Sequence, residues 1–211
     1  TIDEAQSLQQ SFENKTLKPA KLNSFLQNLK EALHISQTNI ESASRILHSF
    51  QLVAVDQCRY TVSQFNLHEY IDNILLSLKP ELKRTSHKVH TNIPAEIEIN
   101  SYPGALSQIV TNLVNNSLFH GYADGNYGNL SLSATETNGW TELHYQDDGK
   151  GMNAEVLEKV FEPYYTTSAD KGGSGLGMGI IQRLVEHDLE GSITVSSEPG
   201  QGVEVVIRFP S

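Results

Sequence analysis

The sequence predicts an α+β fold, in which one mixed sheet carries helices on one face and a long helix precedes the sheet. Residues 1–57 contain no glycine and only one proline, Pro19, which favours helix. From Tyr60 onwards, helical and strand patterns are interleaved without the regular rhythm of a parallel α/β fold. The 211 residues are enough for two modest domains, and we expect them at residues 1–57 and 58–211.

The first part carries a narrow apolar stripe whose positions alternate in spacings of four and three, as in a coiled-coil seam. These positions are Leu22, Leu26, Leu29, Leu33, Ser36, Ile40, Ala43, Leu47, Phe50 and Ala54. A helix with one narrow apolar face cannot bury it alone, so we expect a dimeric helical bundle. The alternative is packing on the chain's own domain. Residues 1–14 are expected to end an earlier helix, with a turn from Asn14 to Pro19.

Apolar residues recurring every three or four positions predict the helices of the second part. These helices are Leu67–Leu82, Tyr102–His120, Ala154–Val160 and Leu176–Asp188. Alternating patterns and turn residues predict the strands. They are Tyr60–Phe65, His87–Ile93 and Ile97–Ile99 around Pro94, a hairpin of Leu130–Thr135 and Thr141–Tyr145 around Asn138-Gly139, and a hairpin of Ile193–Ser197 and Val203–Phe209. A glycine-rich segment is expected from Glu162 to Gly175.

Composition excludes several classes of protein. With 25 acidic and 15 basic residues, the net charge of −10 argues against binding nucleic acid or an anionic membrane. The single cysteine, Cys58, excludes a disulfide scaffold and a cysteine-based zinc site, and it fits a reducing compartment. No apolar run is long enough to span a membrane, so we expect a cytoplasmic chain without membrane contact. Because the chain starts at Thr1 rather than Met, we expect a piece of a longer protein, whose anchoring in the inner membrane stays open.

Asn112 and Asn116 lie one turn apart on the expected helix 102–120, so their amides share one helical face. Amide oxygens in this arrangement can help to hold Mg²⁺, which keeps few protein ligands and fills its shell with phosphate and water. The alternative is two surface or capping asparagines.

The sequence Asp147-Asp148-Gly149-Lys150-Gly151 directly follows an expected strand. An ionised Asp147 can accept a hydrogen bond from an exocyclic amino group such as that of adenine. Gly149 and Gly151 let the backbone approach a flat ligand closely. The alternative is an ordinary acidic turn.

Two more motifs follow. Residues 161–167 place aromatic side chains at the base of a segment that is otherwise small and polar, as in a movable lid, with a plain surface loop as the alternative. Residues 173–180 are rich in glycine and open a helix, so their backbone N–H groups and the helix N-terminus suit phosphate. Their spacing is neither that of a Walker motif nor that of a dinucleotide fold. The fixed order of four motifs between residues 112 and 179 favours a single site.

In this order the motifs resemble the N box, first glycine box, F box and second glycine box of two-component sensor histidine kinases. The resemblance covers residues 60–210. It implies the Bergerat-type ATP-binding α/β sandwich, which gyrase B-, MutL- and Hsp90-type ATPases share. The helix that ends at residues 50–57 resembles the second helix of the kinases' dimerisation hairpin. The resemblance therefore implies a homodimer through the N-terminal helices, Mg-ATP as the ligand, and a response-regulator receiver domain as the partner.

The resemblance also implies a role for each matching residue. Asn116, with Asn112, would hold Mg²⁺ against the ATP phosphates, and Asp147 would accept the adenine amino group. The other residues implied to border the nucleotide or to set the lid are His120, Gly149, Gly151, Phe161, Tyr164, Gly173, Gly175, Leu176, Gly177 and Met178.

Two positions depart from the family pattern. Phe119 stands where the family often has lysine, and Asp148 stands where it often has asparagine. Both support an alternative, a non-catalytic dimerisation module with a degenerate nucleotide site. A gyrase-like or chaperone-like ATPase is a further alternative, but those enzymes use a glutamate near the N box where this chain has Asn112.

A histidine kinase also needs a phosphoacceptor histidine, typically followed by an acidic residue and, a few positions later, a proline. None of the eight histidines has this context. We therefore expect the acceptor to lie upstream of Thr1, and we expect this chain to bind ATP without phosphorylating itself. His34 and His48 are the alternatives, because they lie on the right kind of helix.

Overall fold

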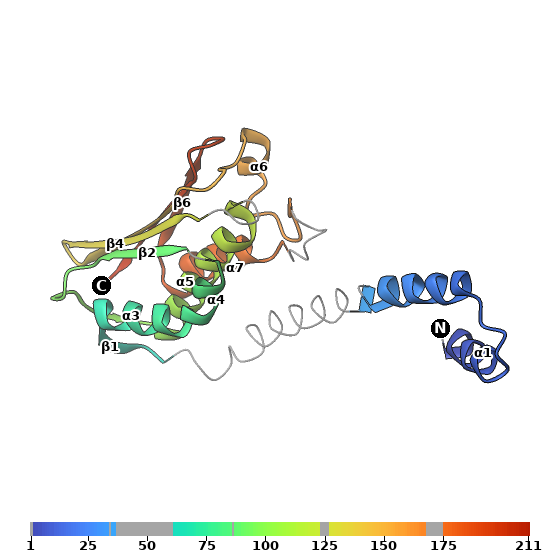
Figure 1. The fold of residues 1–211 in the computed structure, drawn as a ribbon. Coiled ribbons are helices and arrows are strands. Elements are labelled where there is room, and N and C mark those ends of the chain that lie inside the picture. Colours follow the sequence, from blue (N-terminus) through green and yellow to red (C-terminus); the bar gives the residue numbers. More distant parts are fainter. Residues whose placement is uncertain (1, 34, 37–60, 86, 123–126, 168–174) are drawn as a thin grey trace. The chain divides into compact units, whose positions relative to one another are not determined.

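The structure is a computed structural model, and it describes residues 2–33, 35–36, 61–85, 87–122, 127–167 and 175–211 (Figure 1). The chain divides into two compact units, Thr1–His48 and Ser49–Ser211. The boundary that the sequence predicts between residues 57 and 58 lies outside the described residues, as does the apolar stripe beyond residue 36.

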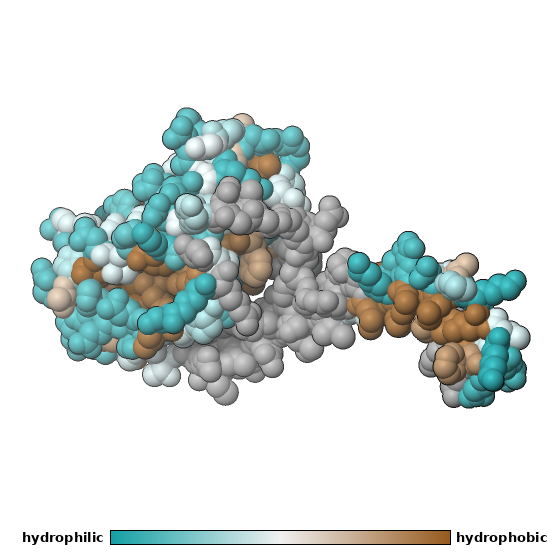
Figure 2. Space-filling view, viewed as in Figure 1, coloured by the Kyte–Doolittle hydropathy of each residue, from teal (hydrophilic) through white to brown (hydrophobic). Residues whose placement is uncertain are grey.

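In the described part of the first unit, two helices are separated by a turn. Helix α1 spans Ile2–Glu13, and a second helix is described over residues 19–33. Between them Lys15 adopts a positive φ of 57°, and Thr16 N donates to Ser11 O at 2.8 Å. The turn therefore lies where the sequence predicts it. Figure 2 shows an apolar band along the second helix. Leu26 and Leu33 of this helix are 51% and 61% exposed.

The second unit is built on a five-stranded mixed sheet with strand order β2-β4-β5-β7-β6. Its strands are β2 (Lys88–Asn92), β4 (Asn129–Thr137), β5 (Trp140–Asp147), β6 (Ser192–Ser197) and β7 (Val203–Pro210). Among the described strands of this sheet, only β2 and β4 pair in parallel. A separate antiparallel pair joins β1 (Ser63–Asn66) to β3 (Glu98–Ser101). The strands on either side of Pro94 thus belong to different sheets.

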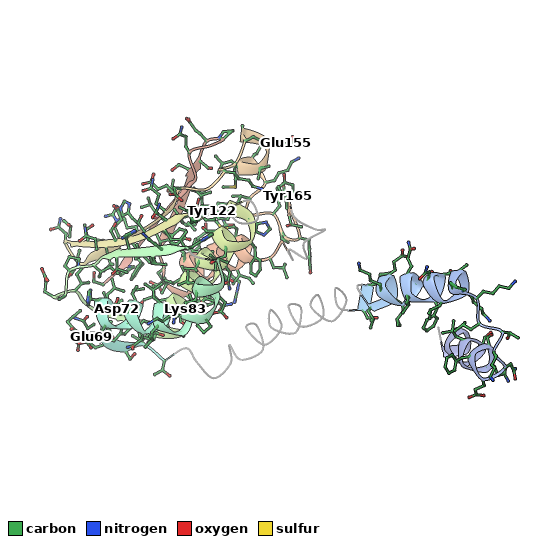
Figure 3. All side chains as sticks on the ribbon, in the orientation of Figure 1. Glu69, Asp72, Lys83, Tyr122, Glu155 and Tyr165 are labelled. Carbon is green, nitrogen blue, oxygen red and sulfur yellow. The ribbon has the colours of Figure 1, made fainter. Side chains whose placement is uncertain are left out.

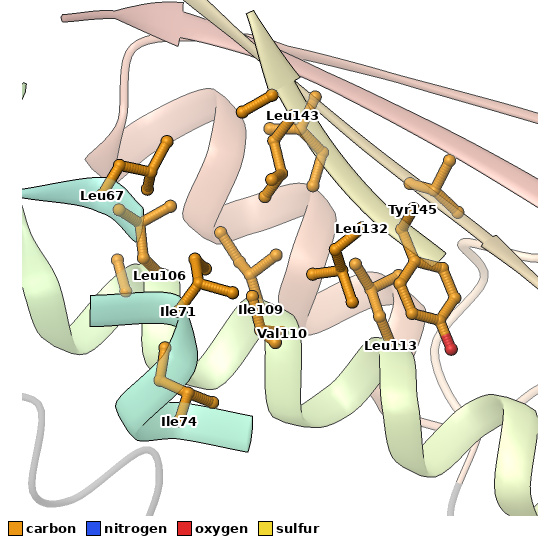
Figure 4. Packing of buried hydrophobic residues seen from close by; sticks show 14 of the residues in the cluster. Leu67, Ile71, Ile74, Leu106, Ile109, Val110, Leu113, Leu132, Leu143 and Tyr145 are labelled. Atoms are coloured by element: carbon orange, nitrogen blue, oxygen red, sulfur yellow. The ribbon is translucent and has the colours of Figure 1, made fainter. Parts of the chain in front are cut away.

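Helices α3 (Leu67–Ser77), α5 (Pro103–Asn116) and α7 (Gly177–Arg183) lie on one face of the sheet (Figure 1). Their apolar side chains form one cluster with the inward residues of β4, β5 and β7. Figure 4 shows Ile109 and Leu113 of α5 facing Leu132, Leu143 and Tyr145 of the sheet. The predicted α+β class, a mixed sheet with helices on one face, is confirmed.

Three of the predicted helices differ from their expected outlines. The segment predicted as one helix, Leu67–Leu82, divides at Leu78 into α3 and α4 (Lys79–Thr85). Pro80 explains the break, because it has no N–H to donate and its ring clashes with the carbonyl four residues earlier. Helices α5 and α7 each pass into a turn of π-helix, η2 (Ser117–Gly121) and η4 (Leu184–Asp188). A short helix, α6, spans Ala154–Glu158.

Candidate functional site

The centre of the candidate site is Asp147, the last residue of β5, whose side chain is only 3% exposed. Its Oδ1 accepts hydrogen bonds from the backbone N–H of Gly149 at 3.0 Å and of Val203 at 3.2 Å. Its Oδ2 accepts a hydrogen bond from the hydroxyl of Ser117, whose Oγ lies 2.5 Å away. A carboxylate offers about four lone-pair positions, so the described donors leave one on Oδ2 for a ligand.

Ser117 is in turn held by a second buried hydroxyl. The Tyr145 hydroxyl donates to Ser117 Oγ at 2.7 Å, and these two residues are 2% and 3% exposed. Burial raises the pKa of Tyr145 far above its ordinary value, and the nearby Asp147 charge adds to the effect, although the bond to Ser117 acts in the opposite direction. Tyr145 is therefore a protonated donor at neutral pH.

Glycines allow three backbone segments to meet around Asp147. A Cβ on Gly149 would lie 2.6 Å from Gly121 O, and Lys150 N donates to this same oxygen at 2.7 Å. A Cβ on Gly151, which has φ +66°, would lie 2.0 Å from Glu198 O. These contacts are closer than any side chain permits, so the first glycine box is folded against both η2 and the β6–β7 turn.

The neighbouring carboxylate, Asp148, is exposed and held by the start of β4. Asn129 donates to it through both its backbone N–H, at 2.8 Å, and its side-chain amide, at 2.7 Å. The Tyr122 hydroxyl also donates, at 2.8 Å (Figure 3 labels Tyr122). Partial burial raises the pKa of Asp148, but these hydrogen bonds outweigh it and leave the pKa below its ordinary value. Asp148 thus joins β4 to β5 and the end of η2.

The two N-box asparagines lie at the C-terminal end of α5. Within the described part of the chain, the buried amide nitrogens of both Asn112 and Asn116 have no hydrogen-bond partner. The other amide atom of Asn116 faces α7, since a Cβ on Gly177 would lie 3.0 Å from Asn116 Oδ1. Two buried amides next to a helix N-terminus are groups that a ligand with polar atoms would satisfy.

The F box and the second glycine box meet through their backbones. Tyr164 N donates to Gly175 O at 3.0 Å, and a Cβ on Gly175 would lie 2.4 Å from the Tyr164 carbonyl carbon. A Cβ on Gly179 would lie 3.3 Å from Phe161 O. Tyr164 has a positive φ of 66° and is 77% exposed, whereas Phe161 is partly buried. The backbone of the F box thus lies against the start of α7.

His120 and Phe119 lie together in η2. Burial lowers the pKa of His120 and the nearby Lys150 charge lowers it further, so His120 is neutral at neutral pH. Phe119 is 58% exposed. Neither residue supplies the positive charge that a lysine would bring to this position.

Most of the predicted site residues lie in one continuous set of contacts within the second unit. Asn116 contacts Gly177 of α7 and precedes Ser117, which binds Asp147, while Gly149 binds Asp147 as well. Leu176 and Met178, both partly buried, flank Gly177 at the start of α7. Gly173 lies outside the described residues.

Residues 102–211 match the sequence profile of the histidine kinase-, DNA gyrase B- and HSP90-like ATPase family. The chain belongs to this family. It is 28% identical over 186 residues to the sensor histidine kinase ZraS of Escherichia coli O157:H7, an alignment that covers 88% of this chain and 34% of ZraS. The chain thus spans about a third of the length of that relative. The expected resemblance to the C-terminal part of a two-component sensor histidine kinase is confirmed.

Two solved structures, one of them of the histidine kinase ThkA, share the ATPase-family fold. Full-length ShkA in complex with AMPPNP aligns with a TM-score of 0.62 at 22% identity, over 94% of this chain and 40% of ShkA. ThkA in complex with the response regulator protein TrrA aligns with a TM-score of 0.60 at 17% identity, over 99% of this chain and 57% of that chain. The expected Bergerat-type fold is therefore confirmed.

The sequence motifs missed several residues of this ATPase-family site. Ser117 and Tyr145 were not singled out, although a tyrosine two residues before Asp147 shares the inward face of β5 with it, which is a usable signal. Gly202 was also missed, although a Cβ there would lie 1.8 Å from Asp147 O. Among the described residues, no group of histidine, cysteine, aspartate and glutamate side chains could hold a metal ion, and no helix is long and apolar enough to cross a membrane.

Proposed function

We propose that the chain binds Mg-ATP and acts as the catalytic part of a sensor histidine kinase, passing the γ-phosphoryl group to a histidine of the dimerisation helices for relay to a response-regulator aspartate. The observation that carries this proposal is the buried carboxylate of Asp147, on whose Oδ2 the described residues leave one lone pair unused. An ionised carboxylate can only accept hydrogen bonds, so the site favours a base that presents an amino group, as adenine does.

The phosphates would lie between the N box and the start of α7. Gly177 lies against Asn116, and the backbone N–H groups at the start of α7 are free of intrahelical partners by position. Backbone N–H groups and glycines can hold phosphates without cationic side chains, which reconciles a polyanionic ligand with the net charge of −10.

Asn112 and Asn116 fit a magnesium site. They lie on one helical face, and the amide oxygen of Asn116 lies beside Gly177. Their buried amide nitrogens, which have no partner among the described residues, are donors that would suit phosphate oxygens next to the ion. Amide oxygens are hard ligands, and Mg²⁺ is usually bound by few protein groups together with phosphate oxygens and water. When bound, the ion would neutralise charge on the phosphates. The protein's own part is to hold the amides and the glycine backbone in fixed positions.

Transfer to a histidine needs little covalent chemistry from this domain beyond positioning and charge stabilisation. We propose that the acceptor lies upstream of Thr1, because none of the eight histidines is followed by the acidic residue and proline typical of acceptors. The exposed leucines of the second helix support a homodimer through the N-terminal helices. ThkA was solved with its response regulator, which supports the same class of partner here.

Nucleotide binding is tested by calorimetry on the full chain with Asp147→Asn. We expect ATP affinity to fall about 100-fold, because a hydrogen bond to a charged group contributes roughly 1.5–3 kcal/mol and the new amide also presents a donor. Asp148→Asn is the matched control, since its side chain is held by Asn129 outside the Asp147 network. Equal affinities for the two variants would refute the adenine site.

The magnesium site is tested with Asn116→Ala, which should remove the gain in ATP affinity that Mg²⁺ gives over EDTA; an unchanged gain would refute it.

Incubation with γ-labelled ATP should leave the chain without acid-labile label. Label on any of its histidines would overturn the upstream acceptor. Steady hydrolysis of ATP would favour a gyrase-like or chaperone-like ATPase. Absence of ATP binding would favour a non-catalytic module.

A further inference from the structure

We propose that Ser117 and Tyr145 are positioning residues that fix the base-binding carboxylate of Asp147 and set the chain's preference for adenine over bases that lack an exocyclic amino group. This inference rests on the proposed nucleotide site and deepens it. Two hydrogen bonds in series link the three residues, and we call them the relay. The Tyr145 hydroxyl donates to Ser117 Oγ at 2.7 Å, and Ser117 Oγ donates to Asp147 Oδ2 at 2.5 Å.

The three residues come from two elements that meet at the bottom of the site. Tyr145 and Asp147 are on β5, two residues apart and therefore on the same face of the sheet. Ser117 is the first residue of η2, immediately after Asn116. All three side chains are 3% exposed or less, so water does not compete for their hydrogen bonds. Figure 4 shows the Tyr145 ring against Leu113, with its hydroxyl at the rim of the apolar cluster.

The direction of each hydrogen bond follows from chemistry. An ionised carboxylate can only accept, so Ser117 must donate to Asp147. A serine hydroxyl has one hydrogen, so its remaining contact with Tyr145 requires the tyrosine to donate. Tyr145 is a protonated phenol at neutral pH, as its environment favours the neutral form. The relay therefore has one orientation, and every hydrogen in it points towards Asp147.

This orientation leaves Asp147 as an acceptor of defined geometry. Oδ1 is occupied by the N–H groups of Gly149 and Val203, and one lone pair of Oδ2 is occupied by Ser117. The carboxylate cannot rotate without breaking all three bonds. Its last lone pair can meet an amino hydrogen but repels a carbonyl oxygen, so a fixed carboxylate discriminates between the two kinds of base more strongly than a mobile one.

The test compares the affinities of the full chain for ATP and for inosine triphosphate, which carries a carbonyl in place of the amino group. Ser117→Ala should weaken ATP binding about ten-fold, the loss expected for one hydrogen bond to a charged group. It should leave inosine triphosphate binding nearly unchanged. Tyr145→Phe should weaken ATP binding about two- to three-fold, because Ser117 still donates but is no longer held in place.

Matched controls remove buried hydroxyls elsewhere. Tyr70→Phe deletes a phenol hydroxyl that donates to Pro103 O at 2.8 Å, and Thr141→Val deletes a buried hydroxyl at the other end of β5, paired with Ser211 at 2.8 Å. Both controls should keep the base preference of the original chain. The double variant Ser117→Ala/Tyr145→Phe should match Ser117→Ala alone in base preference, because Tyr145 acts through Ser117.

The outcomes separate the two proposals. If the original chain does not bind ATP, the proposed nucleotide site fails. If it binds ATP, and Asp147→Asn loses the preference for ATP while Ser117→Ala and Tyr145→Phe retain it, then only the positioning role is overturned. Equal weakening of both nucleotides by Ser117→Ala also overturns it, since that is the effect of a purely structural hydroxyl. Near-ultraviolet circular dichroism on each variant verifies that the fold is retained.

Discussion

Two glycines of the β6–β7 turn allow the close packing around Asp147 to be tested by substitution. Gly200 and Gly202 both have positive φ, +81° and +76°, so alanine is strained at either position. They differ in surroundings. A Cβ on Gly200 would meet nothing within 4 Å, whereas a Cβ on Gly202 would lie 1.8 Å from Asp147 O, far inside the ordinary contact range that begins at 3.4 Å. The pair therefore separates backbone strain from steric contact.

Gly200→Ala should lower the free energy of unfolding by about 1 kcal/mol. A left-handed backbone costs an L-residue roughly 1–2 kcal/mol, and the lower conformational entropy of the unfolded alanine variant offsets part of this cost. Gly202→Ala carries the same cost and also forces β5 and β7 apart at Asp147, which we expect to bring the total to about 3 kcal/mol. Because Val203 N donates to Asp147 Oδ1, this displacement should also lower ATP affinity at least about ten-fold.

Urea unfolding at pH 7 gives the two free energies, and calorimetry gives the ATP affinities of the same preparations. The midpoint of thermal unfolding should be about 5 °C lower for Gly202→Ala than for Gly200→Ala, given the size of the unit. If the two variants differ by less than about 0.5 kcal/mol and bind ATP equally, the close approach of the turn to Asp147 does not exist as described.

Two further predictions concern ionisable groups near the site. Because the folded state lowers the pKa of His120, the unfolded chain binds its proton more readily, and stability should fall as the pH drops below about 6.5. Urea unfolding between pH 7 and 5 should show a smaller fall for His120→Asn than for the original chain; equal slopes would contradict this. Asp148→Ala should cost about 1 kcal/mol at pH 7, a value reduced by exposure. That cost should disappear as the pH falls through the lowered pKa of Asp148, and a cost independent of pH would show that its carboxylate does not bind Asn129 and Tyr122 as a charged group.

Local signals predicted most of the fold. The turn at Asn138-Gly139 is where the sequence places it, with both residues at positive φ, and the pair of strands around it is a hairpin. The final hairpin also follows its predicted outline closely, and the N-box helix begins within one residue of its predicted start. These elements could be predicted from the sequence because hydrophobic periodicity and turn residues involve positions that are close together in the chain.

Features that depend on distant partners were not predictable in this way. The parallel pairing of β2 with β4 joins residues about 40 positions apart, and no local pattern encodes a choice between β4 and the nearby β3. The sequence marked Asp148 as a departure that adds negative charge to the site. The structure shows why it is tolerated, since Asn129, 19 residues earlier, holds the carboxylate. The role of Ser117 could not be predicted from its neighbours in the sequence, because its partners Asp147 and Tyr145 lie on another element, β5.

The sheet order has a consequence for how the protein is made. Asp147 lies on β5, between a strand that precedes it and β7, which follows it by more than 50 residues. A ribosome releases the chain from its N-terminus, so the hairpin of β4 and β5 emerges well before the segment that closes over the carboxylate. Val203 N and the Gly202 turn reach Asp147 only after more than 50 further residues have been synthesised. A nascent chain that ends before β7 therefore lacks part of the proposed base pocket, and we expect nucleotide to stabilise the domain only after β7 has been added.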